Sequence, residues 1–267
     1  MRKILLVFIT CFLIFSGCSK IKDPIYPDDP KIVVLLYHKI SEGEADNLYE
    51  RNRTNFENDL NYLIDNNISV IDFNDLQTIK QSGKMPAGHS AIITFDDGDK
   101  SWYDIAVPLL KRYGMKATFF LWVEKMGSNS FLSWQDVQYI SNITYDGGIK
   151  PFVFGSHSYS HQYLLAGKSN FATAADYSLF LNWELSRSKE LIGEHSPGEV
   201  KILALPYGDG AGDSEIIATV QRNGYNFIRT SRNAVIGSVS DLDLFNIPAF
   251  PVLNSTGSDE IGYYLNN

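Results

Sequence analysis

The chain has 267 residues, of which 44% are hydrophobic, enough for one well-packed domain near the upper size for a single core. Its 31 acidic residues outnumber the 23 basic ones, giving a net charge of -8 at neutral pH. A polyanion would meet mostly repulsion, so the composition argues against a nucleic-acid partner.

The first residues have the pattern of a secretion signal. Two basic residues precede an apolar run over residues 4–15, and two small residues stand directly before Cys18. This run is shorter than the roughly 20 apolar residues that span a bilayer, so a transmembrane anchor is the weaker interpretation.

The surroundings of Cys18 resemble the lipid-attachment site of bacterial lipoproteins, although Phe15 stands where that pattern usually has Leu. We therefore predict a signal peptide over residues 1–17 and a lipidated tether over residues 18–31. The protein would then be exported to the bacterial cell envelope, with the lipid as its only link to a membrane. If Cys18 is instead an ordinary residue of the signal, the exported protein is soluble.

From Ile32 onward, short apolar runs alternate with amphipathic segments. The first expected strand is IVVLLYH, and the helix after it has Thr54 as a possible N-cap. Further strands are expected at residues 68–71, 91–95, 117–122, 151–155, 201–206, 226–230 and 245–250, and further helices at 74–81, 103–113, 135–141, 179–193 and 214–223. Such alternation implies parallel strands joined by helices, and this number of units favours a closed (β/α) barrel over an open sheet. We expect residues 32–267 to form one domain.

Polar residues follow three of these expected strands. Asp96 and Asp97 follow the first, His157 and His161 the second, and Tyr207 the third. Because the carboxyl ends of parallel strands open on one face, these side chains are expected to converge there. Two imidazoles and one carboxylate form a common ligand set for a divalent metal of the zinc class, with positions left open for water.

The spacing within these clusters suggests which residues bind a metal and which acts as a base. Residues four apart, such as His157 and His161, share one side of a helical turn and could grip one ion. Adjacent Asp96 and Asp97 cannot point the same way from an extended chain, so one can bind a metal while the other removes a proton from water. Taken alone, however, the DDG sequence also suits an ordinary turn at the end of a strand, through Gly98.

Three motifs together resemble those of polysaccharide deacetylases of the NodB-homology type, also called carbohydrate esterase family 4. They are TFDDG at residues 94–98, HSYSH at 157–161 and LPYG at 205–208. The resemblance covers roughly residues 91–267, and YHKI at residues 37–40 looks like a segment of relatives that deacetylate poly-N-acetylglucosamine. It implies a distorted (β/α) barrel and a metal-dependent hydrolase acting on carbon–nitrogen bonds other than peptide bonds.

The resemblance also implies residue roles by position. Asp96 would be the general base, and Asp97, His157 and His161 would bind zinc or a similar divalent ion. Tyr207 would offer its backbone N–H to the developing oxyanion. The expected partner is an acetylated polysaccharide, with N-acetylglucosamine units of an extracellular or cell-wall glycan as the substrate.

Two departures from the family pattern are visible. Many members orient the base with the Arg of an RxPYG motif, but Ala204 occupies that position here, so the base must be oriented otherwise. No His follows His195, so the C-terminal His that often protonates the leaving amine is missing. His38, at the end of the first expected strand, is the best substitute, and we weigh this catalytic role evenly against a structural one.

These departures keep three alternatives open. An O-acetyl esterase of the kind that acts on xylan needs less protonation of its leaving group. A glycan-binding protein that has lost turnover would explain Ala204 and the missing acid, although binding alone would not require Asp96 beside a metal. In the third, the metal only stabilises the barrel.

Overall fold

The computed structural model describes residues 29–266. The predicted signal peptide, the lipid site at Cys18 and most of the predicted tether lie outside the described residues. Among the residues that are described, no helix combines the length and apolar character needed to cross a bilayer. The first strand begins at Ile32, where the sequence places the start of the folded body.

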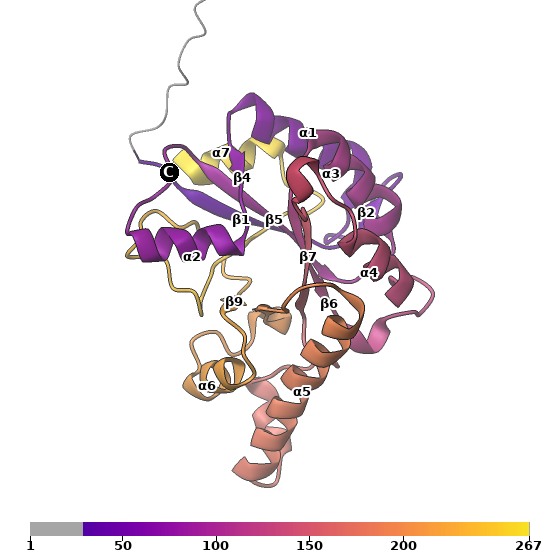
Figure 1. Ribbon diagram of the computed structural model, residues 1–267, viewed down its shortest axis with the longest axis vertical. Helices are drawn as coiled ribbons and strands as arrows, with labels where there is room; N and C mark the ends of the chain where they lie inside the picture. Colours follow the sequence, from indigo (N-terminus) through magenta and orange to yellow (C-terminus); the bar gives the residue numbers. More distant parts are fainter. Residues whose placement is uncertain (1–28, 267) are drawn as a thin grey trace, which may run out of the picture.

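A single curved sheet of parallel strands forms the centre of the molecule (Figure 1). Its strands follow the order β10-β1-β5-β6-β7-β8-β9, and β4 pairs with β5 beside this path. Their bounds are β1 (Ile32–Tyr37), β4 (Ser69–Val70), β5 (Ser90–Asp97), β6 (Ala117–Leu121), β7 (Phe152–Ser156), β8 (Ile202–Ala204), β9 (Phe227–Arg229) and β10 (Phe250–Pro251). The short strands β2 (Ile40–Ser41) and β3 (Arg51–Asn52) form a separate parallel pair.

The barrel is incompletely closed, which corrects the expectation of a closed one. Within residues 29–266, β9 and β10 do not pair along their length, and a single parallel bridge between Arg229 and Ile247 lies in the gap. The expected strand at residues 245–250 is thus reduced to its last residue plus Pro251. One physical reason is Pro248, which has no N–H to donate to a neighbouring strand.

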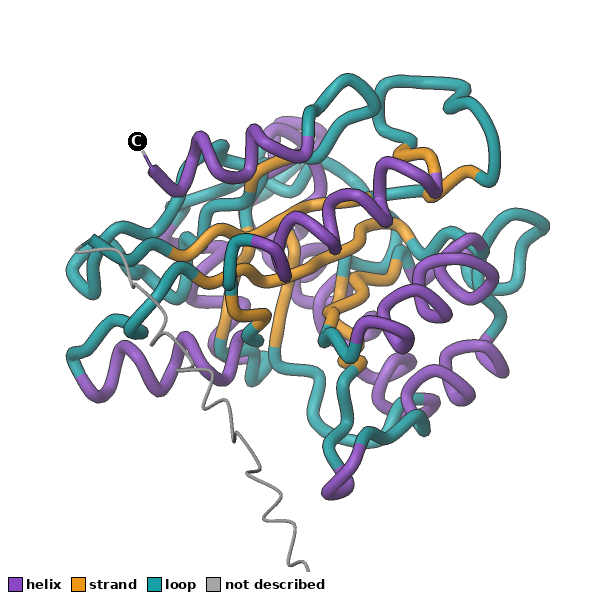
Figure 2. Tube along the Cα trace, turned by 90° about the horizontal axis from the view of Figure 1, so that it is seen from above, coloured by secondary structure: helices purple, strands orange, loops and turns teal. Residues whose placement is uncertain are grey.

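Helices surround the strands (Figure 2). Their bounds are α1 (Arg53–Asp65), α2 (Phe73–Ser82), α3 (Val107–Tyr113), α4 (Trp134–Ser141), α5 (Ala174–His195), α6 (Ser214–Arg222) and α7 (Ser258–Asn266). The side chain of Asn52, not the predicted Thr54, caps α1. A π-helical turn over Trp102–Ala106 precedes α3, and α7 was not predicted.

Both faces of the sheet are buried, which explains the uninterrupted apolar runs in the sequence. In β1, Val33 and Leu35 belong to a hydrophobic cluster that includes residues of α1, α3 and α5, while Val34 and Leu36 belong to a second cluster that includes residues of α2. Side chains alternate between faces because successive residues of a strand point in opposite directions. Since all strands of the sheet are parallel, their carboxyl ends meet along one edge, where the polar residues of the motifs lie.

Candidate active site

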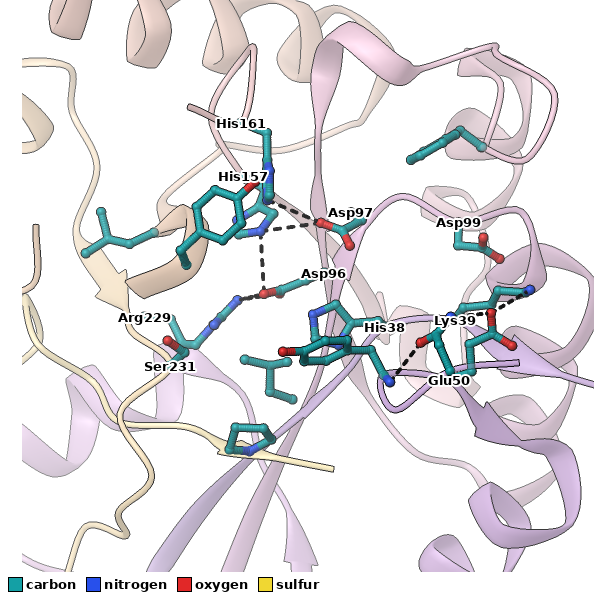
Figure 3. A pocket seen from close by; sticks show the side chains of 17 residues that line it. His38, Lys39, Glu50, Asp96, Asp97, Asp99, His157, His161, Arg229 and Ser231 are labelled. Carbon is teal, nitrogen blue, oxygen red and sulfur yellow. Dashed lines mark hydrogen bonds and ion pairs between the residues drawn. The ribbon is translucent and has the colours of Figure 1, made fainter. Parts of the chain in front are cut away.

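A pocket of about 730 Å³ opens at the carboxyl edge of the sheet (Figure 3). It takes side chains from segments that lie far apart in the sequence, because strands from both halves of the chain end there. All six residues that the sequence singled out line it, namely His38, Asp96, Asp97, His157, His161 and Tyr207. Arg229 lines it as well, although the sequence motifs assign that residue no role.

Asp97, His157 and His161 bring three donor atoms within 4.8 Å of one another. Oδ1 of Asp97 lies 3.6 Å from Nε2 of His157 and 3.5 Å from Nε2 of His161 (Figure 3). Two imidazole nitrogens and one carboxylate oxygen match the ligands that zinc and similar ions prefer. The structure therefore brings together the three residues that the sequence proposed as a metal set.

The protonation pattern of these residues also fits a cation. Nδ1 of His157 lies 2.9 Å from the carbonyl oxygen of Ala204, which can only accept, so Nδ1 carries the proton and Nε2 presents a lone pair to the carboxylates. Burial lowers the pKa of His157 to about 3 and that of His161 to about 4. Burial and the charge of Asp96 raise the pKa of Asp97 to about 7. Two neutral imidazoles therefore face a carboxyl that is about half protonated near pH 7, and a positive ion among them would stabilise the ionised carboxylate.

The two histidines do not lie on a helical turn, so that part of the prediction is wrong. Strand β7 ends at Ser156 and an irregular loop carries both imidazoles. Local side-chain bonds replace the helical ones: the Ser158 N–H donates to Oγ of Ser156 (3.1 Å), and the His161 N–H donates to Oγ of Ser158 (3.0 Å). Serine often offers the backbone such an alternative to helix.

Backbone strain is concentrated at this site. Non-glycine residues rarely have positive φ, and of the five that do so in the described chain, only Asn67 lies elsewhere. The other four are Asp97 (φ 89), Ser158 (φ 60), His161 (φ 58) and Tyr207 (φ 59). Such conformations persist only where the surrounding structure enforces them, and they are often found where residues are held for function.

Asp96 is buried at the end of β5 with only 3% of its surface exposed. One nitrogen of Arg229, Nη2, contacts both of its carboxylate oxygens, and Nε2 of His157 lies 3.6 Å from Oδ2 (Figure 3). Burial favours the protonated form, but the charge of Arg229, with smaller contributions from the imidazoles of His157 and His38, outweighs it and holds the pKa of Asp96 below its usual value. Asp96 is therefore ionised near neutral pH, as a proton acceptor must be.

Arg229 supplies the guanidinium that is missing at position 204. In the parallel pairing of β8 with β9, Ala204 and Arg229 are direct neighbours, so the charge enters from the adjacent strand at the same level. The side chain is fully buried and its guanidinium carbon lies 5.1 Å from the ring centre of Phe120. A signal was present in the sequence: NFIRT is an apolar strand that ends in a cation at the edge where the acidic residues gather.

His38 follows β1 and lines the pocket. Its carbonyl oxygen accepts a hydrogen bond from Nε1 of Trp102 (2.7 Å), and its ring lies edge to face with Tyr49. Nδ1 is buried and has no hydrogen-bond partner among the described residues. Burial lowers the pKa of His38, and the charge of Asp96 opposes that shift.

Tyr207 lies in the turn that follows β8. The Gly208 and Asp209 N–H groups close this turn by donating to Leu205 and Pro206, and the Tyr207 N–H takes no part in it. The Tyr207 ring stacks on Tyr163 with 4.1 Å between ring centres, and both rings are about half exposed. The turn thus presents an aromatic surface beside His161 as well as a backbone donor.

Comparisons with known proteins point in the same direction. A family model described as polysaccharide deacetylase matches residues 83–228. The poly-β-1,6-N-acetyl-D-glucosamine N-deacetylase of Staphylococcus epidermidis is 26% identical over 200 residues, which are 74% of this chain and 66% of that protein. The protein of the same name in Staphylococcus aureus is 26% identical over 178 residues, 65% of this chain and 59% of that protein. The chain thus spans 66% or less of the length of these two relatives.

Solved structures establish the fold. The Streptococcus pyogenes deacetylase PplD, in complex with acetate, has a TM-score of 0.74 at 19% identity, over 89% of this chain and 99% of that one. IcaB from Ammonifex degensii has a TM-score of 0.72 at 19% identity, over 91% of this chain and all of that one. At such identities the likeness concerns the fold alone, and it confirms the predicted distorted (β/α) barrel.

Proposed function

The chain belongs to the polysaccharide deacetylase family, and from this premise we propose that it removes acetyl groups from N-acetylglucosamine units of an extracellular or cell-wall polysaccharide. The reaction is hydrolysis of a carbon–nitrogen bond that is not a peptide bond. The observation that carries the proposal is the convergence, in one pocket, of an ionised carboxylate on Asp96 and the donor set of Asp97, His157 and His161.

The donor set of Asp97, His157 and His161 would hold a divalent ion, for which we propose zinc. Mixed imidazole and carboxylate ligands suit this ion better than calcium or magnesium, which prefer oxygen alone. A bound ion of this kind lowers the pKa of water and polarises a carbonyl oxygen. The hydrogen bond from His157 to Ala204 orients one ligand for that task.

Asp96 acts as the general base that takes a proton from the attacking water. Its carboxylate lies beside the donor set, 3.6 Å from Nε2 of His157, so both groups face the same small volume. Arg229 contacts both carboxylate oxygens, which fixes the orientation of the base and keeps it ionised. A base that is ionised and oriented before the substrate arrives needs little rearrangement during the reaction.

Two groups act on the acetyl substrate from the other walls of the pocket. The backbone N–H of Tyr207 donates to the oxygen that becomes negative during attack. In its protonated form, which the charge of Asp96 favours, His38 donates a proton to the departing amine, since it is the imidazole of the described pocket that lies outside the donor set. An amine needs that proton far more than an alcohol does, so the position of His38 favours the N-acetyl substrate over an O-acetyl ester.

Export and lipid attachment at Cys18 form a second part of the proposal, supported by the residue pattern of the first 18 residues. Mass spectrometry of the membrane fraction should find a lipidated N-terminal Cys18 and no residues before it. Replacement of Cys18 by Ser should release the protein from that fraction. A C18S protein that stays with the membrane would overturn the anchor.

The catalytic proposal is tested by acetate release from N-acetylglucosamine oligomers, with acetylated xylan in parallel. Release from the oligomers should stop when a chelator removes the metal and return when zinc is added. Faster release of acetate from xylan than from the oligomers would assign the protein as an O-acetyl esterase in place of an N-deacetylase. No release from either substrate by zinc-loaded protein would leave a glycan-binding protein as the better description.

A further inference from the structure

Glu184 lies in the middle of α5, the helix that packs against β7, and its side chain is completely buried. Removing a carboxylate from water is costly unless other groups replace the lost hydration. Within residues 29–266, Glu184 forms no ion pair with a basic side chain. The burial of this carboxylate therefore depends on hydrogen bonds. Those that it accepts from the described residues all come from one loop.

Three hydrogen bonds reach Glu184 from the loop between the two histidines. Oε2 accepts from the backbone N–H groups of Tyr159 (3.0 Å) and Ser160 (2.9 Å). Oε1 accepts from Oγ of Ser160 (2.5 Å). Two successive N–H groups that point at one oxygen form a small anion-binding concavity, and a charged acceptor makes such bonds strong.

This loop needs external support because Ser158 and His161 both have left-handed backbone conformations. Non-glycine residues adopt them at a cost in free energy, so contacts from outside must compensate. One turn after Glu184, Oγ of Ser188 lies 2.7 Å from Oγ of Ser156, which in turn accepts from the Ser158 N–H. Helix α5 thus holds the loop at two points.

We propose that Glu184 is a positioning residue for the metal set: its carboxylate fixes the loop so that His157 and His161 face Asp97 before any ion arrives. The inference rests on the proposed function, since it assumes that these three residues bind a divalent ion. Glu suits the position better than Gln, because the negative charge of its carboxylate strengthens all three hydrogen bonds and a neutral amide lacks that charge. Outer residues of this kind typically change metal affinity about 10–100-fold when they are altered.

The test is zinc binding to metal-free protein, measured by calorimetry for the unaltered chain and for Glu184→Gln. The dissociation constant of E184Q should rise about 10–100-fold, with circular dichroism showing that the variant is folded. Glu190→Gln is the matched control on the same helix, because Glu190 is exposed and pairs with Arg187. Its dissociation constant should stay within about twofold of the unaltered value.

The outcomes separate this inference from the proposed function. Folded E184Q that binds zinc as tightly as the unaltered protein overturns the role of Glu184 and leaves the metal site intact. Absence of zinc binding by the unaltered protein overturns both. If E184Q does not fold, Ser160→Ala provides the test. This change removes one of the three hydrogen-bond donors to Glu184, and Ser160 is only partly buried, so the variant should fold. Zinc affinity must then fall measurably, and unchanged affinity overturns the inference.

Discussion

Two buried arginine–aspartate pairs can be compared in this molecule, and only one of them lies in the pocket. Arg51 pairs with Asp59 near the C-terminal segment, and Arg229 pairs with Asp96 at the carboxyl edge of the sheet. All four side chains are almost completely removed from solvent. By charge and burial alone the two pairs are alike, so the difference lies in their remaining contacts.

The pair of Arg51 and Asp59 is saturated with hydrogen bonds. Two guanidinium nitrogens bind the carboxylate, at 2.6 and 2.9 Å, and the third donates to carbonyl oxygens of the C-terminal segment. The same carboxylate also accepts from the hydroxyl groups of Tyr37 (3.1 Å) and Ser258 (2.6 Å). This pair joins β3 and α1 to the segment before α7 and has no capacity left for a ligand.

The pair of Arg229 and Asp96 is incompletely bonded. Only Nη2 of Arg229 contacts the carboxylate, and its Nε is buried without a partner among the described residues. In the described chain Asp96 accepts hydrogen bonds from Arg229 alone, and it faces the pocket. Residual hydrogen-bonding capacity, more than burial or charge, therefore distinguishes a pair that can take part in catalysis from one that stabilises the fold.

The largest expected effect comes from Asp96→Asn. Acetate release should fall by about 10²–10⁴-fold, because general acid–base catalysis typically contributes that much, while zinc binding is retained. Steady-state kinetics and calorimetry measure the two effects. Asp99→Asn is the matched control, since Asp99 is another acid of the same pocket, and it should change the rate by less than about tenfold. Unchanged turnover in D96N would remove Asp96 from its role.

Disruption of the pair of Arg51 and Asp59 should lower stability and leave the rate of the folded enzyme unchanged. Asp59→Asn should lower the free energy of unfolding by about 3–5 kcal/mol, because it leaves the buried Arg51 without its counter-ion. The control is Glu42→Gln, whose partner Arg53 lies at the surface, and which should cost about 1 kcal/mol or less. Urea unfolding provides both values. A D59N enzyme with normal stability and reduced kcat would contradict the purely structural role of Arg51 and Asp59.

Arg229→Met should lower kcat by about 10²-fold with little change in KM, because a misdirected base slows the reaction more than binding. Returning the guanidinium to the adjacent strand, in the double variant Ala204→Arg with Arg229→Ala, should restore part of the rate. Kinetics with thermal unfolding of each variant separates catalysis from folding. Equal losses in kcat for R229M and for the double variant, with both folded, would argue against a positioning role.

The smallest effect is expected from His38→Gln, which should lower the release of acetate from N-acetylglucosamine oligomers by about 10²-fold or somewhat less. Any O-acetyl ester that the enzyme accepts should lose less, because an alcohol leaves without full protonation. The ratio of the two losses is the measurement. A larger loss on the ester, or equal losses, would favour the structural role of His38 that the sequence left open.

The sequence predicts the order of the elements well, because buried strands on both faces give continuous apolar runs and the motifs follow them directly. NFIRT marks Arg229 as a cation at the end of an apolar strand, but its pairing with Asp96 depends on how the curved sheet brings β9 near the end of β5. The loop of His157 and His161 escaped prediction for a similar reason. Glu184 accepts hydrogen bonds from the two residues between its left-handed ones, and no local pattern in HSYSH reveals that contact.

Helix ends and the C-terminal region show the same limit on a smaller scale. Asn52 and Thr54 are both good N-cap residues, and only the path of the chain through β3 selects Asn52. The C-terminal α7 packs near α1, and its short apolar face gives a weak signal in isolation.

The direction of β1 gives the molecule two functional ends. The chain enters the strand at Ile32, and six residues of strand, about 20 Å, separate that entry from His38 in the pocket. Under the proposed anchor, the tether would join the folded body at the end of β1 opposite the pocket, so attachment would not cover the mouth of the pocket. A glycan strand could then reach the pocket while the enzyme stays attached.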